Sequence, residues 1–93
     1  MSNTIRLIRN SKLMDIVPWA RTKQHGKVKA GLMPPPISTG QRGVAYFEQE
    51  VYATLAVTIA GYNDEQIKEF VRDLVSKRKD LLKQYTHLEA AND

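Results

Sequence analysis

Apolar positions in the second half of the chain recur with helical spacing. A stripe at i, i+4 and i+8 is formed by Val51, Leu55 and Ile59. It predicts a helix that begins near Glu48 and ends at Gly61, because glycine readily adopts the left-handed conformation that terminates a helix. We expect this helix to close the core.

A longer helical pattern covers about residues 64–88, with Asn63 or Asp64 as its N-cap. Apolar residues recur in it every seven positions, with one aromatic residue between them: Ile67, Phe70, Leu74, Leu81 and Leu88. Sustained heptads are typical of a coiled coil, so we expect these residues to join a homodimer. The alternative is that the first half of the helix packs on the preceding domain and the rest is solvated. Residues 89–93 are expected to be disordered.

The first half of the chain has shorter apolar segments. Residues 5–8 form a lead-in whose apolar side chains can enter the core. Ser11 is the expected N-cap of a short helix over residues 12–17, which Pro18 ends because proline disfavours helix at the preceding residue. Trp19, in the turn that follows, is expected to anchor the core between two helices.

A second helix is predicted from Thr22, as its N-cap, to Ala30, with Gly31 as its stop. Most of its positions are polar, and Gly26 destabilises it by roughly 1 kcal/mol relative to alanine. So polar a helix cannot be buried on most of its surface. DNA phosphates and bases would be a suitable second neighbour.

A small hairpin is predicted next. Two short runs, Ile37-Ser38 and the apolar residues 44–46, flank a glycine-containing turn at residues 39–43. The prolines at 34–36 forbid helix and would aim the hairpin. The alternative is that they form a polyproline ligand for a partner domain.

The predicted order of elements is helix, helix, hairpin, helix. It indicates a mainly α fold with a small β-hairpin wing, namely a winged helix-turn-helix followed by a long C-terminal helix. We assign residues 1–61 to the winged domain and residues 62–93 to the C-terminal helix. The expected core residues are Leu13, Trp19, Val28, Val44, Leu55 and Ile59.

Charge is distributed unevenly, although the net charge is only +4. Residues 1–47 carry eight Lys or Arg and one acid, whereas residues 48–93 carry six bases and nine acids. Between Ile16 and Phe47 there is no acid. The asymmetry points to a polyanion as the partner of the first half, and double-stranded DNA fits. A solvated basic face is the alternative.

The predicted DNA-binding residues lie on the second helix and at the hairpin turn. They are Arg21, Thr22, Lys23, Gln24, His25, Lys27, Lys29 and Arg42. Lys23, Gln24 and Lys27 are expected to include the base readers, because Gln suits adenine and Lys suits guanine. We expect Arg42 to contact a phosphate or the minor groove. It could instead be solvated, or paired with Glu48 or Glu50.

Other classes of protein find no support in the sequence. The absence of cysteine excludes disulfides and thiolate metal sites, and a reducing cytoplasm is the expected location. No apolar run approaches the roughly 20 residues that span a bilayer, and no apolar segment of signal-peptide length opens the chain. We find no metal cluster, phosphate-cradling glycine loop or activated nucleophile. We therefore expect no enzyme, no metal, no cofactor and no membrane partner.

The hairpin region carries a motif that resembles the AlpA family of small phage-type regulators. The motif consists of residues 31–37 (GLMPPPI), Gly40, Arg42, Ala45, Tyr46, Glu50 and Val51, and the opening residues 6–9 also fit. The resemblance covers roughly residues 5–60. It implies a winged-helix fold related to excisionases and to MerR-type domains. It also implies sequence-specific DNA binding, in transcription control or in excision of an integrated element.

Three functions stay open. The first is a transcriptional regulator of a prophage or another mobile element. The second is an excisionase-type recombination directionality factor that bends DNA for an integrase. The third is a protein-interaction adaptor that uses the proline run and the heptad helix. Integrase and RNA polymerase are further candidate partners of the first two.

Overall fold

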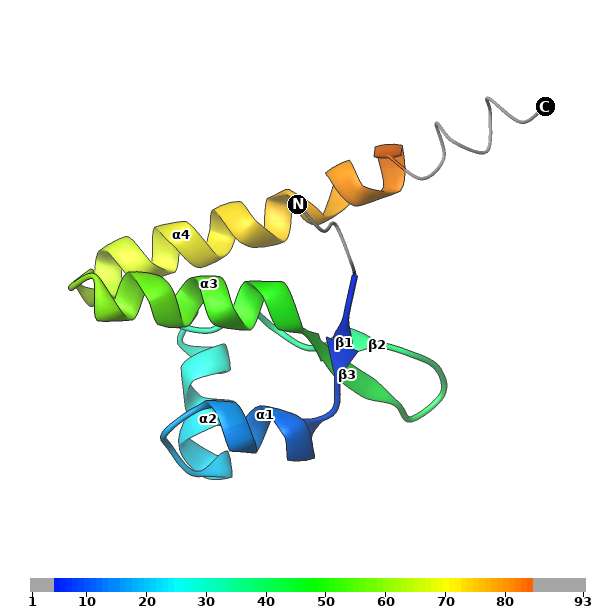
Figure 1. Cartoon of the computed structure of the whole chain (residues 1–93), viewed down its shortest axis with the longest axis horizontal. Helices are drawn as coiled ribbons and strands as arrows, with labels where there is room; N and C mark the ends of the chain where they lie inside the picture. The colour runs from blue at the N-terminus through cyan, green and yellow to red at the C-terminus, as the bar shows by residue number, and fades with distance from the viewer. Residues whose placement is uncertain (1–4, 85–93) are drawn as a thin grey trace.

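The computed structural model describes residues 5–84, a mainly helical fold with four helices and a small three-stranded antiparallel sheet (Figure 1). In chain order the elements are β1 (Leu7–Ile8), α1 (Asn10–Ile16), α2 (Arg21–Lys29), β2 (Ile37–Ser38), β3 (Val44–Phe47), α3 (Glu48–Ile59) and α4 (Asp64–Ser76). Figure 1 shows α3 and α4 packed side by side above α1 and α2. The β2–β3 hairpin projects away from the helices.

β3 is the central strand of the sheet, with β1 on one edge and β2 on the other. The predicted hairpin is confirmed, because β2 pairs with β3 in the register Ile37 to Ala45. The Thr39 N–H donates to the Gly43 carbonyl at 3.0 Å and closes the loop. β1 was not predicted as a strand, since two residues are too few for alternation to be recognised.

α1 begins two residues earlier than predicted. Its N-cap is Arg9, so Ser11 lies inside the first turn. Leu13 explains the register, because it is fully buried and its N–H donates to the Arg9 carbonyl at 3.0 Å. Burial of one leucine outweighs the capping preference of serine.

α2 also begins earlier than predicted. Its N-cap is Ala20, and Thr22 lies within the helix. The buried Gln24 donates its N–H to the Ala20 carbonyl at 3.0 Å. Burial of Gln24, and not capping by the Thr22 side chain, therefore determines where α2 begins.

The predicted helix stops and the predicted cap of the last helix are confirmed. Gly31 and Gly61 follow α2 and α3 with positive φ of 81° and 96°. In both cases the N–H groups of the glycine and of the next residue donate into the last helical turn. α4 opens with a capping box in which Asn63 and Gln66 exchange hydrogen bonds of 2.9 Å.

The core lies where α1, α3, the sheet and the segment of residues 31–36 meet; this segment, which contains the three prolines, is called the proline connector. Its buried apolar residues are Ile8, Leu13, Val17, Met33, Tyr46 and Val51. Trp19, Val28 and Leu55 pack against this cluster, as predicted.

Two predicted core residues lie outside, since Val44 is 53% exposed and Ile59 is 87% exposed. An i+8 residue lies about 80° around a helix of 3.6 residues per turn, so Ile59 turns away from Val51. Val44 is the first residue of β3 and lies beside the exposed hairpin loop at residues 39–43.

The C-terminal helix is interrupted. α4 ends at Ser76, Lys77 forms a turn, and residues 78–84 are helical again. The Ser76 hydroxyl donates to the Asp73 carbonyl at 2.8 Å, and the Asp80 N–H donates to the Lys77 carbonyl at 3.0 Å. These local bonds compete with the regular helical pattern. Leu88 and residues 89–93 lie outside the described residues.

Candidate nucleic-acid interface

α2 presents a polar and mainly cationic face to solvent. Its exposed residues with functional side chains are Arg21, Thr22, Lys23, His25 and Lys29. Gly26 lies among them, and a Cβ built there would meet no atom within 4 Å. The fold itself therefore does not require glycine at this position.

Gln24 is a correction to the predicted DNA-binding set. Its side chain is 1% exposed, and its Oε1 accepts a 2.7 Å hydrogen bond from Trp19 Nε1. Its Nε2 is buried without a partner among residues 5–84. Gln24 therefore lies on the inner face of α2, where it cannot reach a base. Residue type gave no signal of this, because a polar side chain is ordinarily solvated.

Lys27 is held by the same tryptophan. Its Nζ lies 4.4 Å from the centroid of the Trp19 ring, and the residue is half-buried. A cation over an aromatic face is attracted to the ring electrons. Trp19 thus holds two α2 side chains, Gln24 through its N–H and Lys27 through its ring face.

Arg21 lies at the start of α2 and contacts α1. With the Asn10 amide turned to place its oxygen toward Arg21, that oxygen accepts from Nε at 3.0 Å and from Nη2 at 3.2 Å. The contact fixes the guanidinium at the junction of the two helices. Because Asn10 is neutral, the positive charge of Arg21 is not cancelled.

Arg42 lies at the exposed tip of the β2–β3 hairpin. A hollow of about 630 Å³ separates this tip from the start of α1, and it is lined by Arg42, Thr39, Arg9 and Asn10 among others. Two arginines far apart in sequence therefore line one hollow. Arg9 was not among the residues predicted from the sequence, because only the folded hairpin brings it close to Arg42.

Ion pairs leave the basic first half largely unneutralised. Glu48 lies 4.0 Å from Arg6, and Glu50 pairs with Arg78, so neither carboxylate pairs with Arg42. Among residues 5–84, no carboxylate forms an ion pair with these cations of α1, α2 and the hairpin: Lys12, Arg21, Lys23, Lys27, Lys29 and Arg42. The positive potential of this surface is thus available to a polyanion.

The predicted dimer residues lie against the chain's own domain. Ile67 is 8% exposed, so its assignment to a dimer interface is corrected. Phe70 packs edge-on against Tyr62, with ring centroids 6.4 Å apart. Leu74 and Leu81 line a hollow of about 320 Å³ against residues of β3 and α3. Ile67 and Phe70 thus pack within the chain, whereas Leu74 and Leu81 are half-buried beside this hollow; Leu88 lies outside the described residues.

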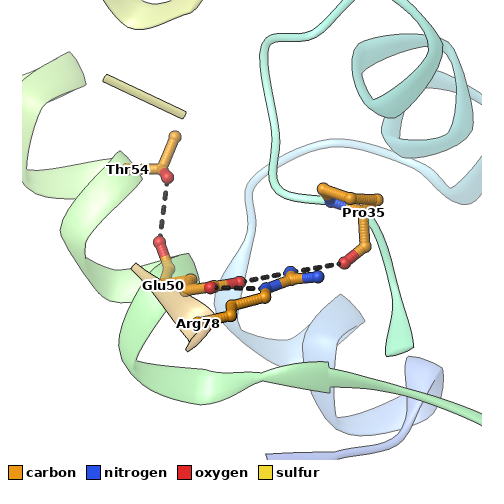
Figure 2. Close-up of polar contacts among 4 residues, drawn as sticks. All are labelled: Pro35, Glu50, Thr54 and Arg78. Carbon is orange, nitrogen blue, oxygen red and sulfur yellow. Dashed lines mark hydrogen bonds and ion pairs between the residues drawn. The ribbon is translucent and has the colours of Figure 1, made fainter. Parts of the chain in front are cut away.

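Arg78 forms the principal ion pair of the structure and ties three segments together (Figure 2). Its Nε and Nη2 donate to the Glu50 carboxylate at 2.8 and 2.6 Å, and Nη2 also donates to the Pro35 carbonyl at 2.9 Å. The Glu50 side chain is 4% exposed. This contact holds the proline connector, and with it the start of the hairpin, against α3. Arg78 is 28 positions from Glu50 and 43 positions from Pro35 in the sequence. No local sequence pattern predicts contacts over such separations.

Two further findings bear on function. Within the described part of the chain, no three His, Asp or Glu side chains come close enough to hold a metal ion. None of the helices found there combines the length and the apolar character needed to cross a membrane.

Comparisons with family models, with curated proteins and with solved structures gave no match.

Proposed function

We propose that this protein is a sequence-specific DNA-binding regulator with a winged helix-turn-helix domain. α1 and α2, joined by residues 17–20, would form the helix-turn-helix, and the β2–β3 hairpin would be the wing. The outer face of α2 would enter the major groove while the hairpin tip follows the neighbouring backbone. The observation that carries the proposal is the set of cations on both elements that have no carboxylate partner among residues 5–84.

The surroundings of each α2 side chain suggest its role. Lys23 and Lys29 are exposed and free to meet base edges or phosphates. Lys27 is restrained over the Trp19 ring. A restrained lysine is better suited to contact a phosphate and position the protein than to read a base. Gly26 leaves the outer face of the helix shallow, and this favours a close approach of DNA to the backbone.

The motif that resembles the AlpA family supports a regulator of a prophage or another mobile element. Met33 and Pro34 of this motif are buried, and Pro35 accepts the hydrogen bond from Arg78. The motif residues thus position the hairpin relative to α2. The same packing argues against the adaptor function, because a partner domain would need an accessible proline run.

Selection from a pool of randomised duplex DNA tests the proposal. We expect enrichment of a defined site. Lys23→Ala should reduce the affinity for this site and relax the preference at one base pair. Lys79→Ala is the matched control, because it removes an exposed lysine from the C-terminal helical segment. Failure to enrich any sequence, with no binding to random duplex, would contradict the proposal. Equal effects of the two substitutions would show that α2 is not the reading element.

A further inference from the structure

α3 has an exposed face that carries a second heptad pattern. Gln49, Tyr52, Ala56 and Ile59 are spaced i, i+3, i+7 and i+10 and are all exposed. Tyr52 is 51% exposed and Ile59 is 87% exposed. Thr54, on the opposite side of the helix, is 1% exposed and faces the core.

Charge is absent from this region of α3. Residues 51–62 contain no Asp, Glu, Lys or Arg. Ala53 and Leu55, which flank the exposed stripe, are also apolar, as is Ala60 directly after its last residue. A helix that is apolar around most of its circumference is normally buried on all sides. Here one side remains uncovered, although α4 packs along another.

We propose that this face binds a second copy of the same chain, with the two α3 helices packed antiparallel about a two-fold axis near Ala56. Ile59 lies three residues after Ala56 and Tyr52 lies four before it. An antiparallel pair therefore places each Ile59 beside Tyr52 of the second copy, while the small Ala56 side chains let the helices approach. A face that complements itself in this way fits an isologous interface.

The uncharged α3 face is compatible with a second copy and offers nothing to a partner that recognises charge. Two copies of a basic protein repel each other wherever their cations face one another. The α3 stripe brings no charge to the contact, and the cations of α1, α2 and the hairpin lie on other elements. A partner chosen by charge would find nothing on this face to recognise.

The interface is small. One face of a 12-residue helix belongs to the low size class, below about 1,200 Å² in total. We therefore expect a weak dimer in free solution that becomes populated when two half-sites lie side by side on DNA. This second point rests on the proposed function, whereas self-association itself does not.

Sedimentation of the purified chain without DNA tests the interface. We expect reversible dimers at high concentration, with the dissociation constant raised by about tenfold or more by Ile59→Lys. Lysine near the C-terminus of a helix is compatible with the dipole, so folding should be retained. Leu82→Lys is the matched control, since Leu82 is 66% exposed but lies in the C-terminal helical segment. Dimers abolished by Leu82→Lys and unaffected by Ile59→Lys would overturn the proposal, as would a monomer at all concentrations.

A cross-linking experiment tests the position of the axis. The chain has no cysteine, so Ala56→Cys introduces a single thiol. A disulfide requires Cβ atoms about 3.5–4.5 Å apart, which residues near a two-fold axis can satisfy. We expect oxidation to give a covalent dimer with Ala56→Cys and little with Thr22→Cys on α2. Equal cross-linking of the two variants would contradict the α3 interface. Neither readout depends on DNA, so a failure of this proposal is distinguishable from a failure of the proposed function.

Discussion

Lys23 and Gln24 are neighbours in α2 with opposite surroundings. Lys23 is exposed, whereas Gln24 is buried and accepts a hydrogen bond from Trp19. In the sequence the two looked equally suited to read bases. Successive side chains point about 100° apart around the helix axis. Only the way α2 packs in the fold therefore decides which of the two side chains can contact DNA.

We predict that substitutions at these two positions act on different properties. Gln24→Ala should lower the free energy of unfolding by about 2–3 kcal/mol, because it leaves a cavity and removes the partner of the Trp19 N–H. Lys23→Ala should change stability by less than about 0.5 kcal/mol and reduce DNA affinity. Chemical denaturation and DNA titration of both variants separate the effects. A Gln24→Ala variant of unchanged stability but altered base preference would contradict the assignment.

At the scale of elements, the sequence predicted most of the fold for identifiable reasons. The α3 and α4 patterns are long enough for helical periodicity to register, and Gly31, Gly61 and Asn63 mark helix ends by local backbone chemistry. β1 was missed because two residues are too few for alternation to be recognised, and the break at Lys77 was missed because the local hydrogen bonds of Ser76 and Asp80 leave no mark in the apolar spacing. The candidate site followed from charge, but the hollow shared by Arg9 and Arg42 depends on how the hairpin folds back.

The contact of Arg78 with Glu50 and Pro35 is expected to hold the elements together. Arg78→Ala would leave the Glu50 carboxylate buried and unpaired, which typically costs about 3–5 kcal/mol. Lys77→Ala is the control, because the Lys77–Asp73 pair is 64% and 58% exposed and should contribute less than about 1 kcal/mol. Denaturant unfolding of the two variants gives the comparison. Similar stability of both would show that the contact is dispensable.

The hairpin is expected to contribute to affinity rather than to specificity. Arg42 lies at its tip without a carboxylate partner in the described chain, so it can meet a phosphate. Arg42→Ala should weaken binding to all sequences alike and reduce the salt slope by about one. Gln41→Ala changes a neutral neighbour in the same turn and should have little effect. If Arg42→Ala instead relaxed the preference at one base pair, the hairpin would be a reading element.

At the scale of the whole molecule, the two halves of the chain differ in charge and in the elements they carry. The basic half carries α1, α2 and the hairpin, and the acidic half carries α3 and α4, which cover the core and support the hairpin through Arg78. Sequence composition alone predicted this division. It did not predict the uncovered face of α3, because the sequence does not show which side of an apolar helix faces the core.

The salt dependence of DNA binding tests the central claim most directly. If α2 and the hairpin neutralise about five phosphates, the logarithm of the affinity for duplex DNA should fall against the logarithm of salt concentration with a slope near −4.5. Fluorescence anisotropy of a labelled duplex, titrated at several salt concentrations, gives this slope. A variant with Lys23, Lys29 and Arg42 all changed to Ala should show a slope shallower by about three units. An affinity independent of salt, or a slope that the triple substitution leaves unchanged, would contradict DNA binding through this surface.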